Sequence, residues 1–246
     1  MEESASLPIT QEARPVRNLA FLSKLTEKAV FHQIHEHMVD MGLYPIAQSA
    51  YRENHSTETA ILKVKNDILL NMNKRHVILL VLLDLSAAFN TVDHDILLTA
   101  LNKRKLGGRA FEWFRSYLSG RCQRISVRGC QSESFNLNCA VPQGYCLGPL
   151  MFTIYTSSLL DAIQDHLPSV YCYADDTQLY ISFRPADETG HSDAIAAIEL
   201  CIQVIKNWMH DSKVLLNEYK TEFLLIGTKQ QLAKVNISHC RWPDSN

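Results

Sequence analysis

Two apolar runs, one ended and one interrupted by aspartate, constrain the fold more than any other feature of the sequence. The stretch HVILLVLLDLS places seven apolar residues, 77–83, directly before Asp84, and such a run predicts a buried β-strand. The stretch VYCYADDTQLYISF, residues 170–183, is rich in Val, Tyr, Ile and Phe and also predicts a strand, yet Asp175 and Asp176 lie in its middle. We expect a hairpin turn at this pair. Both placements put carboxylates beside surroundings of low dielectric constant.

Carboxylates in such places need a compensating charge. Two of them about 4 Å apart repel by on the order of 4 kcal/mol at an effective dielectric constant near 20. A divalent cation offsets this repulsion directly, and carboxylate oxygens suit Mg²⁺. Asp84, Asp175 and Asp176 therefore predict a metal-binding cradle. A tight Asp-Asp-Thr turn without metal is the alternative, because aspartate also favours turns, and the pair alone leaves both interpretations open.

The remaining pattern mixes helices and strands without strict alternation, which predicts an α+β fold. Ser56 precedes one apolar-periodic segment and is expected to cap it, and residues 1–13 are polar and expected to be loose. Helices are expected at 19–39, 57–70, 90–106, 108–120, 150–163 and 192–211, and further strands at 122–129, 134–141 and in a pair that ends at 227.

Composition narrows the class of protein. The 246 residues are 46% hydrophobic, enough for one large domain or two small ones. The net charge of -2 offers no general attraction to nucleic acid, but residues 101–130 hold eight basic residues and one acidic residue. Such a segment either follows a phosphate backbone or forms an ordinary solvated face.

The chain also lacks the signals of secretion and membrane insertion. No apolar run reaches the roughly 18 residues needed to span a bilayer, and MEESASLPIT is not a signal-peptide pattern. The seven cysteines form no C-x-x-C pair, which indicates reduced thiols. We expect an intracellular protein of the nucleus, the cytoplasm or both, not secreted and without a membrane partner.

Six segments, in order along the chain, resemble the motifs of reverse transcriptases in the form found in non-LTR, LINE-like retrotransposons of the CR1/L2/jockey type. The resemblance extends over residues 14–227. Motif A is matched by LLDLSAAFNTVDHDIL, motif B by AVPQGYCLGPLMFTIY, motif C by YADD, motif D and its approach by NWMHDSKVLLNEYKTEFLLIG, and the two fingers motifs by RPVRNLAFLSKLTEKAV and QSAYRENHSTETAIL.

This resemblance implies the fingers and palm of a right-hand polymerase, with an antiparallel palm sheet backed by helices. The implied activity is that of an RNA-directed DNA polymerase, which transfers a nucleotide from a dNTP to the 3′-hydroxyl of a DNA primer on an RNA template with two Mg²⁺ or Mn²⁺ ions. The thumb and endonuclease of such proteins are expected to be missing, so a partner or a missing segment would supply the thumb. The implied divisions are a disordered N-terminus at 1–13, fingers at 14–80 and 101–141, a palm at 81–100 and 142–227, and a truncated tail at 228–246.

The resemblance also implies catalytic residues. Asp84 and Asp175 correspond to the metal ligands, and Asp176 to the second aspartate of the pair, which supports the site and contacts a metal or the primer end. Lys220, in YKTE, corresponds to the motif D lysine, a candidate proton donor to the leaving pyrophosphate. A solvated surface lysine is the alternative reading of Lys220.

The implied substrate-binding residues come from motifs A and B and from the fingers. An aromatic residue at Phe89 would wall off the sugar 2′-position, or would be a core aromatic at a helix start. Gln143 and Gly144 would line the incoming nucleotide, or would belong to an ordinary loop before a helix. Arg52 and Arg14 would lie near the triphosphate, or would form surface salt bridges.

Some positions depart from the family pattern. Asn90 stands where an aspartate is usual, Tyr145 where a small residue is usual, and Glu218-Tyr219 where a Pro-Asp type pair is usual. These departures leave a second hypothesis open, a non-catalytic retrotransposon remnant or a nucleic-acid-binding module. An unrelated α+β domain with turn aspartates is the third.

Overall fold

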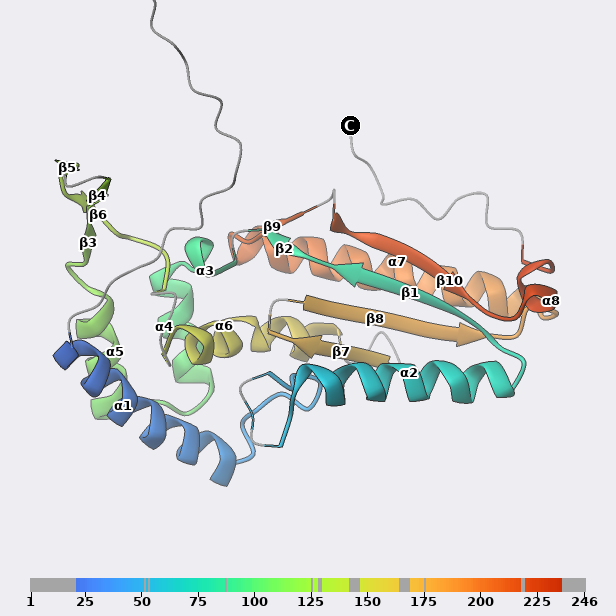
Figure 1. Ribbon diagram of the computed structural model, residues 1–246, viewed down its shortest axis with the longest axis horizontal. Helices are drawn as coiled ribbons and strands as arrows, with labels where there is room; N and C mark the ends of the chain where they lie inside the picture. The colour runs from blue at the N-terminus through green and yellow to red at the C-terminus, as the bar shows by residue number, and fades with distance from the viewer. Residues whose placement is uncertain are drawn as a thin grey trace, which may run out of the picture.

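The centre of the computed structural model is a four-stranded antiparallel sheet in the order β10-β1-β8-β7 (Figure 1). Its strands are β1 (Val77–Leu83), β7 (Ser169–Tyr173), β8 (Asp176–Phe183) and β10 (Glu222–Ile226). The structure describes residues 21–50, 52, 54–86, 88–124, 126–127, 130–141, 147–163, 169–174, 176–217 and 220–235.

Strand β1 is apolar at every position because both of its faces are covered. Val77, Leu79, Val81 and Leu83 point into the larger core, which includes residues of two long helices. The residues between them, Ile78 and Leu80, belong to a smaller core on the opposite face of the sheet. Alternate side chains of a strand point to opposite faces, so a central strand between two layers has no position for a polar residue. The expected buried strand is confirmed.

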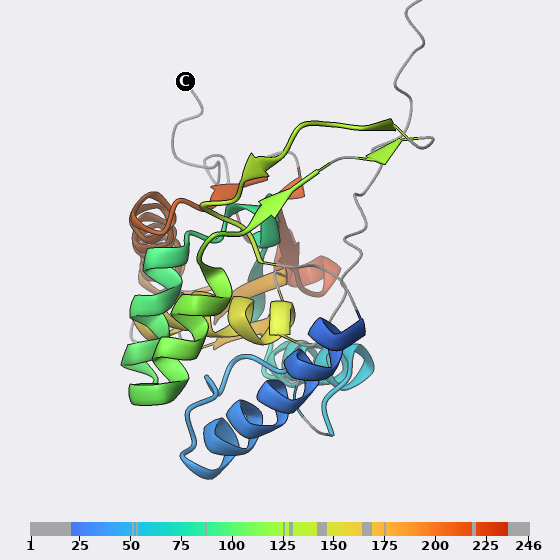
Figure 2. The same cartoon turned by 90° about the vertical axis from the view of Figure 1, so that its left-hand side faces the viewer.

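Helices cover the sheet on both sides. Helix α2 contacts β1 and β7, and α7 contacts β8 on the other face, where α6 packs beside α7 (Figure 1). Helices α1, α4 and α5 extend this assembly beyond one end of the sheet (Figures 1 and 2). The bounds are α1 (Phe21–Asp40), α2 (Thr57–Asn73), α3 (Ala88–Thr91), α4 (His94–Lys103), α5 (Gly108–Leu118), α6 (Leu147–Ile163), α7 (Glu188–Asp211) and α8 (Lys229–Leu232).

Capping explains where the helices agree with expectation and where they differ. Ser56 caps α2 as expected, since its hydroxyl accepts from the Thr59 amide at 3.2 Å. The single helix expected over 90–106 is wrong, because α3 ends at Thr91. The Asp93 side chain accepts from the amides of Asp95 and Ile96 and so caps the start of a separate helix, α4. Likewise, Asp187 caps α7 and moves its start from the expected residue 192 to Glu188.

The short strands pair differently from the sequence expectation. The two final strands do not pair with each other, because β9 (Leu215–Leu216) pairs with β2 (Leu85–Ser86) and β10 pairs with β1. The expected hairpin near residues 122–141 is present as two short pairs, β3 (Cys122–Gln123) with β6 (Phe135–Asn136) and β4 (Ser126–Val127) with β5 (Cys130–Gln131). These pairs form an arm that extends from the body (Figure 2).

Three further expectations concern the two ends of the chain and membranes. The expected loose segment, 1–13, lies outside the described residues. Within the expected tail, 228–246, Thr228 caps the short helix α8. Among the described helices, none combines the length and the apolar character that crossing a membrane requires.

Candidate active site

The register of β1 and β8 brings two aspartates to the same end of neighbouring strands. Leu83 lies opposite Thr177 in this antiparallel pair. One further step of the same register places Asp84, the next residue of one strand, beside Asp176, the first residue of the other. Asp84 is half-buried and Asp176 is exposed, so this end of the sheet presents carboxylates to solvent from a rigid base.

Lys220 lies over the first of these carboxylates. Its Nζ is 3.9 Å from Asp84 Oδ2, and the lysine side chain is 62% exposed against 33% for the aspartate. An ion pair this long and this exposed stabilises the fold by less than about 1 kcal/mol. The Asn217 amide donates to the Asp84 carbonyl at 2.9 Å, and the Lys220 amide donates to the Asn217 carbonyl at 3.1 Å. The backbone therefore holds the lysine beside the aspartate.

A glutamine from a distant loop holds the turn that precedes the aspartate pair. Gln48 Oε1 accepts from the amides of Ala174 at 3.0 Å and Ala50 at 3.1 Å, and Gln48 Nε2 donates to the Ala174 carbonyl at 3.1 Å. The Gln48 side chain is 1% exposed. Ala174 has φ 58, a left-handed conformation that costs a non-glycine residue roughly 1 kcal/mol. Gln48 thus satisfies both backbone groups of a residue in an unfavourable conformation.

The backbone of the same loop docks along β7. The Cys172 amide donates to the Ala47 carbonyl at 2.8 Å, and the Ser49 amide donates to the Cys172 carbonyl at 3.0 Å. The Tyr171 hydroxyl donates to Ser49 Oγ at 2.7 Å. The residue after Ala174, Asp175, lies outside the described residues.

Phe89 lies at the start of the chain segment that follows Asp84. Its ring stacks on that of Phe152 in α6, with centroids 4.9 Å apart and planes at 30°. The Val141 amide donates to the Phe89 carbonyl at 2.9 Å, so the residue that precedes the PQG sequence is held beside Phe89. The ring is half-buried rather than fully covered, and Asn90 beside it is exposed.

The start of α4, which follows motif A, is linked by an ion pair and hydrogen bonds to the segment that precedes motif D. Lys213 Nζ lies 2.6 Å from Asp93 Oδ2, and the Tyr155 hydroxyl donates to the Ser212 carbonyl and accepts from the Asp93 amide at 3.4 Å. Burial alone would raise the pKa of Asp93, but its hydrogen bonds with Lys213 and with two backbone amides outweigh burial and lower that pKa. This junction ties the segment that follows Asp84 to the segment that leads to Asn217, whose amide donates to the Asp84 carbonyl.

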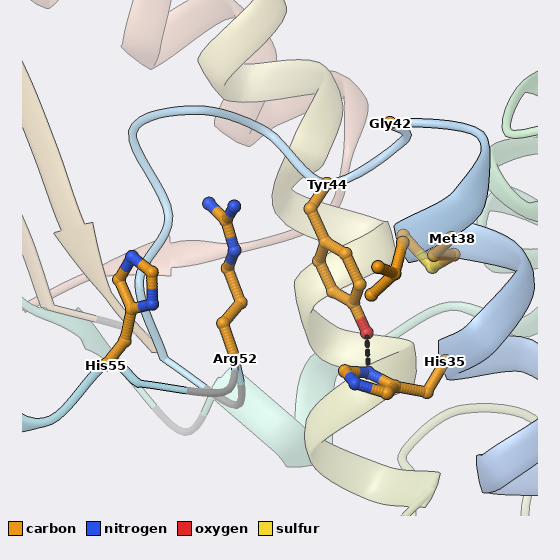
Figure 3. A pocket seen from close by; sticks show the side chains of 7 residues that line it. His35, Met38, Gly42, Tyr44, Arg52 and His55 are labelled. Carbon is orange, nitrogen blue, oxygen red and sulfur yellow. Dashed lines mark hydrogen bonds between the residues drawn. The ribbon is translucent and has the colours of Figure 1, made fainter.

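Arg52 lies in a pocket of about 200 Å³ between α1 and the loop that follows it (Figure 3). Its guanidinium is 5.8 Å from the centre of the Tyr44 ring and donates to the Gln48 carbonyl at 3.2 Å. The Tyr44 hydroxyl shares a hydrogen bond of 2.7 Å with His35 Nδ1, and His55 lines the other side. Burial raises the pKa of Tyr44 to about 12, against the opposing effect of Arg52, so the phenol stays neutral.

The basic stretch between residues 101 and 130 is divided among α4, α5 and the arm. Part of it has structural partners. Arg104 pairs with Asp161 at 2.6 Å, Arg115 pairs with Glu112, and Arg121 lies over the Tyr117 ring at 4.6 Å. These contacts explain three of the eight cations without any ligand, and the expected phosphate contact of the others stays a prediction.

The structure therefore places Lys220 beside Asp84 and brings the strand ends that carry Asp84 and Asp176 to one end of the sheet, with Phe89 on the segment that follows Asp84. It places Arg52 in the pocket of Figure 3. Within the described part of the chain, no three His, Cys, Asp or Glu side chains cluster as metal ligands. Of the expected site residues, Arg14, Gln143, Gly144 and Asp175 lie outside the described residues, as do Tyr145 and Glu218-Tyr219.

Comparison with known proteins decides the family. Residues 4–240 match the sequence family described as "Reverse transcriptase (RNA-dependent DNA polymerase)". The chain belongs to this family. This reverse transcriptase domain is related to those of non-LTR, LINE-like retrotransposons, as the sequence motifs predicted.

Two curated relatives illustrate the relationship. The probable RNA-directed DNA polymerase from transposon BS of Drosophila melanogaster is 28% identical over 182 residues, which are 72% of this chain and 20% of that protein. The RNA-directed DNA polymerase from mobile element jockey of Drosophila funebris is 25% identical over 212 residues, 84% of this chain and 22% of that protein. The chain thus spans about a fifth of the length of these relatives.

Solved structures show the same fold. Apo telomerase from Candida tropicalis matches with a TM-score of 0.62 at 13% identity, over 83% of this chain and 37% of that one. A telomerase from Candida albicans, in complex with the TWJ fragment of telomeric RNA, matches with a TM-score of 0.59 at 12% identity, over 82% of this chain and 35% of that one. The expected α+β polymerase fold of the reverse transcriptase domain is confirmed.

Proposed function

We propose that this chain catalyses template-directed addition of deoxynucleotides to a primer 3′-hydroxyl, as the RNA-directed DNA polymerase domain of a retrotransposon protein. The observation that supports the proposal is the β1–β8 register, which ends at Leu83 opposite Thr177 and so brings the strand ends that carry Asp84 and Asp176 to one end of the sheet. Family membership supports the reaction class. Asp175, the residue between Ala174 and Asp176, is the third carboxylate of the proposed site.

The donor set fits a hard divalent cation, and reverse transcriptases as a family generally use divalent metal ions. Carboxylate oxygens are ligands that Mg²⁺ and Mn²⁺ accept. Lys220 lies 3.9 Å from Asp84, so this carboxylate already tolerates positive charge nearby. Asp84, Asp175 and Asp176 would hold two Mg²⁺ or Mn²⁺ ions, which when bound would lower the pKa of the primer hydroxyl and neutralise charge on the pyrophosphate.

Other residues of the chain would position the substrates. The Phe89 ring is held in place by stacking on Phe152. It would therefore exclude a ribose 2′-hydroxyl by steric clash. Gln143 and Gly144 follow Val141, whose amide donates a hydrogen bond to the Phe89 carbonyl. They would line the nucleotide next to the Phe89 ring. Positioning of this kind lowers the barrier by holding the reacting atoms in place.

The proposed cationic residues act on the phosphates. Lys220 would give a proton from Nζ to the leaving pyrophosphate, and its exposure leaves that proton accessible. Arg52 and Arg14 would bind the triphosphate. Arg52 would then exchange its contacts with Tyr44 and the Gln48 carbonyl for phosphate oxygens.

The proposed partners are an RNA template, a DNA primer and a dNTP. The bound TWJ RNA fragment of the Candida albicans telomerase supports an RNA partner for this fold. Cations of the segment 101–130 would contact template or primer phosphates, which position a nucleic acid without reading its sequence. A further segment or a partner would supply a thumb, and the protein would work inside the cell, in the nucleus, the cytoplasm or both.

Primer extension on poly(rA)/oligo(dT) with Mg²⁺ or Mn²⁺ tests the proposal. The wild type is expected to extend the primer, and Asp84→Asn and Asp176→Asn are expected to abolish extension. Asp193→Asn, an exposed position on α7, is the matched control and should retain it. If the wild type extends no primer even with a thumb segment appended, or if Asp84→Asn extends as fast as the control, the proposal is wrong.

A further inference from the structure

A second hollow lies at the end of the sheet opposite the aspartates. It has a volume of about 710 Å³ and lies where α2 ends, β1 begins, β8 ends and α8 follows β10 (Figure 1, right-hand end). Three separate segments each supply cations to its lining. We call this hollow the basic groove, and its four cations are Lys74, Arg75, Arg184 and Lys234.

The basic groove has an acidic neighbour just outside its lining, Asp187, which interacts electrostatically with Arg184. No acidic residue is among the described residues that line it, and none of its four cations forms an ion pair within the described part of the chain. All four side chains are exposed. The groove therefore presents a concentrated positive potential that a ligand can reach.

His76 lies beside the basic groove, and the groove cations lower its pKa further than burial alone. Arg184 Nε lies 3.4 Å from His76 Nε2 in a hydrogen bond, and the ring nitrogen can accept only in the neutral imidazole. Burial lowers the pKa of His76, and the charges of Arg184 and Lys74 lower it further. The ring thus remains neutral beside Arg184, and the potential comes from the four permanent cations.

We propose that the basic groove binds the phosphate backbone of a nucleic-acid helix, at a site separate from the catalytic end of the palm. Four unpaired cations fit a polyanion, and Thr228 and Gln230 in the same lining offer the neutral donors that commonly contact phosphate oxygens. No aromatic side chain is among the described lining residues, so unstacked bases would find no platform there. A helix, whose bases are stacked internally, is the ligand that this lining suits.

The length of the sheet separates the basic groove from the proposed catalytic site. The β1–β8 register runs from Val77 opposite Phe183 at the groove to Leu83 opposite Thr177 at the aspartates. Six steps of about 3.3 Å separate these ends by roughly 20 Å. At 3.4 Å per base pair this corresponds to about six base pairs. The groove goes beyond the proposed polymerase reaction, because none of its residues belongs to the catalytic set.

Salt-dependent binding of a 16-base-pair RNA duplex, measured by fluorescence anisotropy, tests the proposal. Lys74→Gln/Lys234→Gln removes two cations from the groove, and Lys28→Gln/Lys65→Gln removes two exposed cations outside it. Each phosphate contact contributes about 0.9 to the slope of log K against log salt. The groove pair should reduce the slope by about 1.8, which corresponds to roughly 60-fold weaker binding in 0.1 M KCl than the wild type. The control pair should change the slope by much less.

Two results would overturn the proposal. One is an equal change in slope for the groove pair and the control pair. The other is competition by poly-L-glutamate as strong as that of unlabelled duplex, which would mean that the groove takes acidic polypeptide instead. Repeating the titration in the Asp84→Asn background separates this proposal from the polymerase reaction, because the groove effect should persist there whether or not the chain extends primers.

Discussion

Replacing Gln48 by leucine tests how the turn before the aspartate pair is held. The side chain makes three hydrogen bonds to two residues, Ala174 and Ala50, while it is 1% exposed. The Ala50 amide is fully buried and would lose its partner at a cost of about 2 kcal/mol. The two groups of half-buried Ala174 would regain some water, and we assign each about 0.5 kcal/mol. Leucine resembles glutamine in size and leaves no large cavity, so the expected loss of unfolding free energy is about 3 kcal/mol.

Urea unfolding measures this loss, and amide hydrogen exchange locates it. Gln203→Leu is the control, because Gln203 is exposed on α7 and its side chain bonds to its helix neighbour Asn207, so the change should alter stability by less than about 0.5 kcal/mol. In Gln48→Leu the Ala174 amide should exchange faster than the amides in the middle of β1. A loss of under 1 kcal/mol, or unchanged protection at Ala174, would refute the role given to Gln48.

Three further predictions concern the same end of the molecule. Ala174→Gly should raise the unfolding free energy by about 0.5–1 kcal/mol, because glycine relieves the left-handed φ of 58; a loss on urea unfolding would contradict this. Lys220→Gln should change stability by less than about 1 kcal/mol, because its pair with Asp84 is long and exposed, but should slow primer extension at saturating dNTP; unchanged extension would remove its role as proton donor. The pKa of Asp93 is lowered in the folded chain, so its pair with Lys213 stabilises the fold above the ordinary pKa of 3.8 and this stabilisation is lost as the pH falls through the lowered value. In thermal melts, Asp93→Asn should therefore lose less stability than the wild type between pH 5 and pH 2. Parallel stability curves for the two proteins would contradict the lowered pKa.

Local signals in the sequence predicted the elements that depend on local causes. The uninterrupted apolar run predicted β1, because a strand covered on both faces needs apolar residues at every position. Ser56 predicted the start of α2, because a cap bonds within its own turn. The break before α4 was missed although its cause, Asp93, is also local, because the apolar periodicity continues across it.

Contacts between distant segments could not be predicted in this way. Gln48 lies in a loop with no periodic pattern, and its partner Ala174 is 126 residues away, so nothing near Gln48 in the sequence indicates the interaction. The pairing of β9 with β2 rather than with β10 likewise depends on the path of the chain between them. Arg52 was expected beside the triphosphate from its motif, whereas its contacts with Tyr44 and Gln48 depend on how the loop packs against α1.

The measurement that tests the central claim most directly is a Mn²⁺ titration by isothermal calorimetry, since it does not depend on a thumb. Asp84 and Asp176 are proposed to form one site. Asp84→Asn and Asp176→Asn should then each weaken binding by about tenfold or more, and the double variant should lose little beyond the larger single effect. Asp193→Asn should bind as the wild type does. Wild-type affinity in either single variant, or two losses that simply add, would contradict a shared site at this end of the sheet.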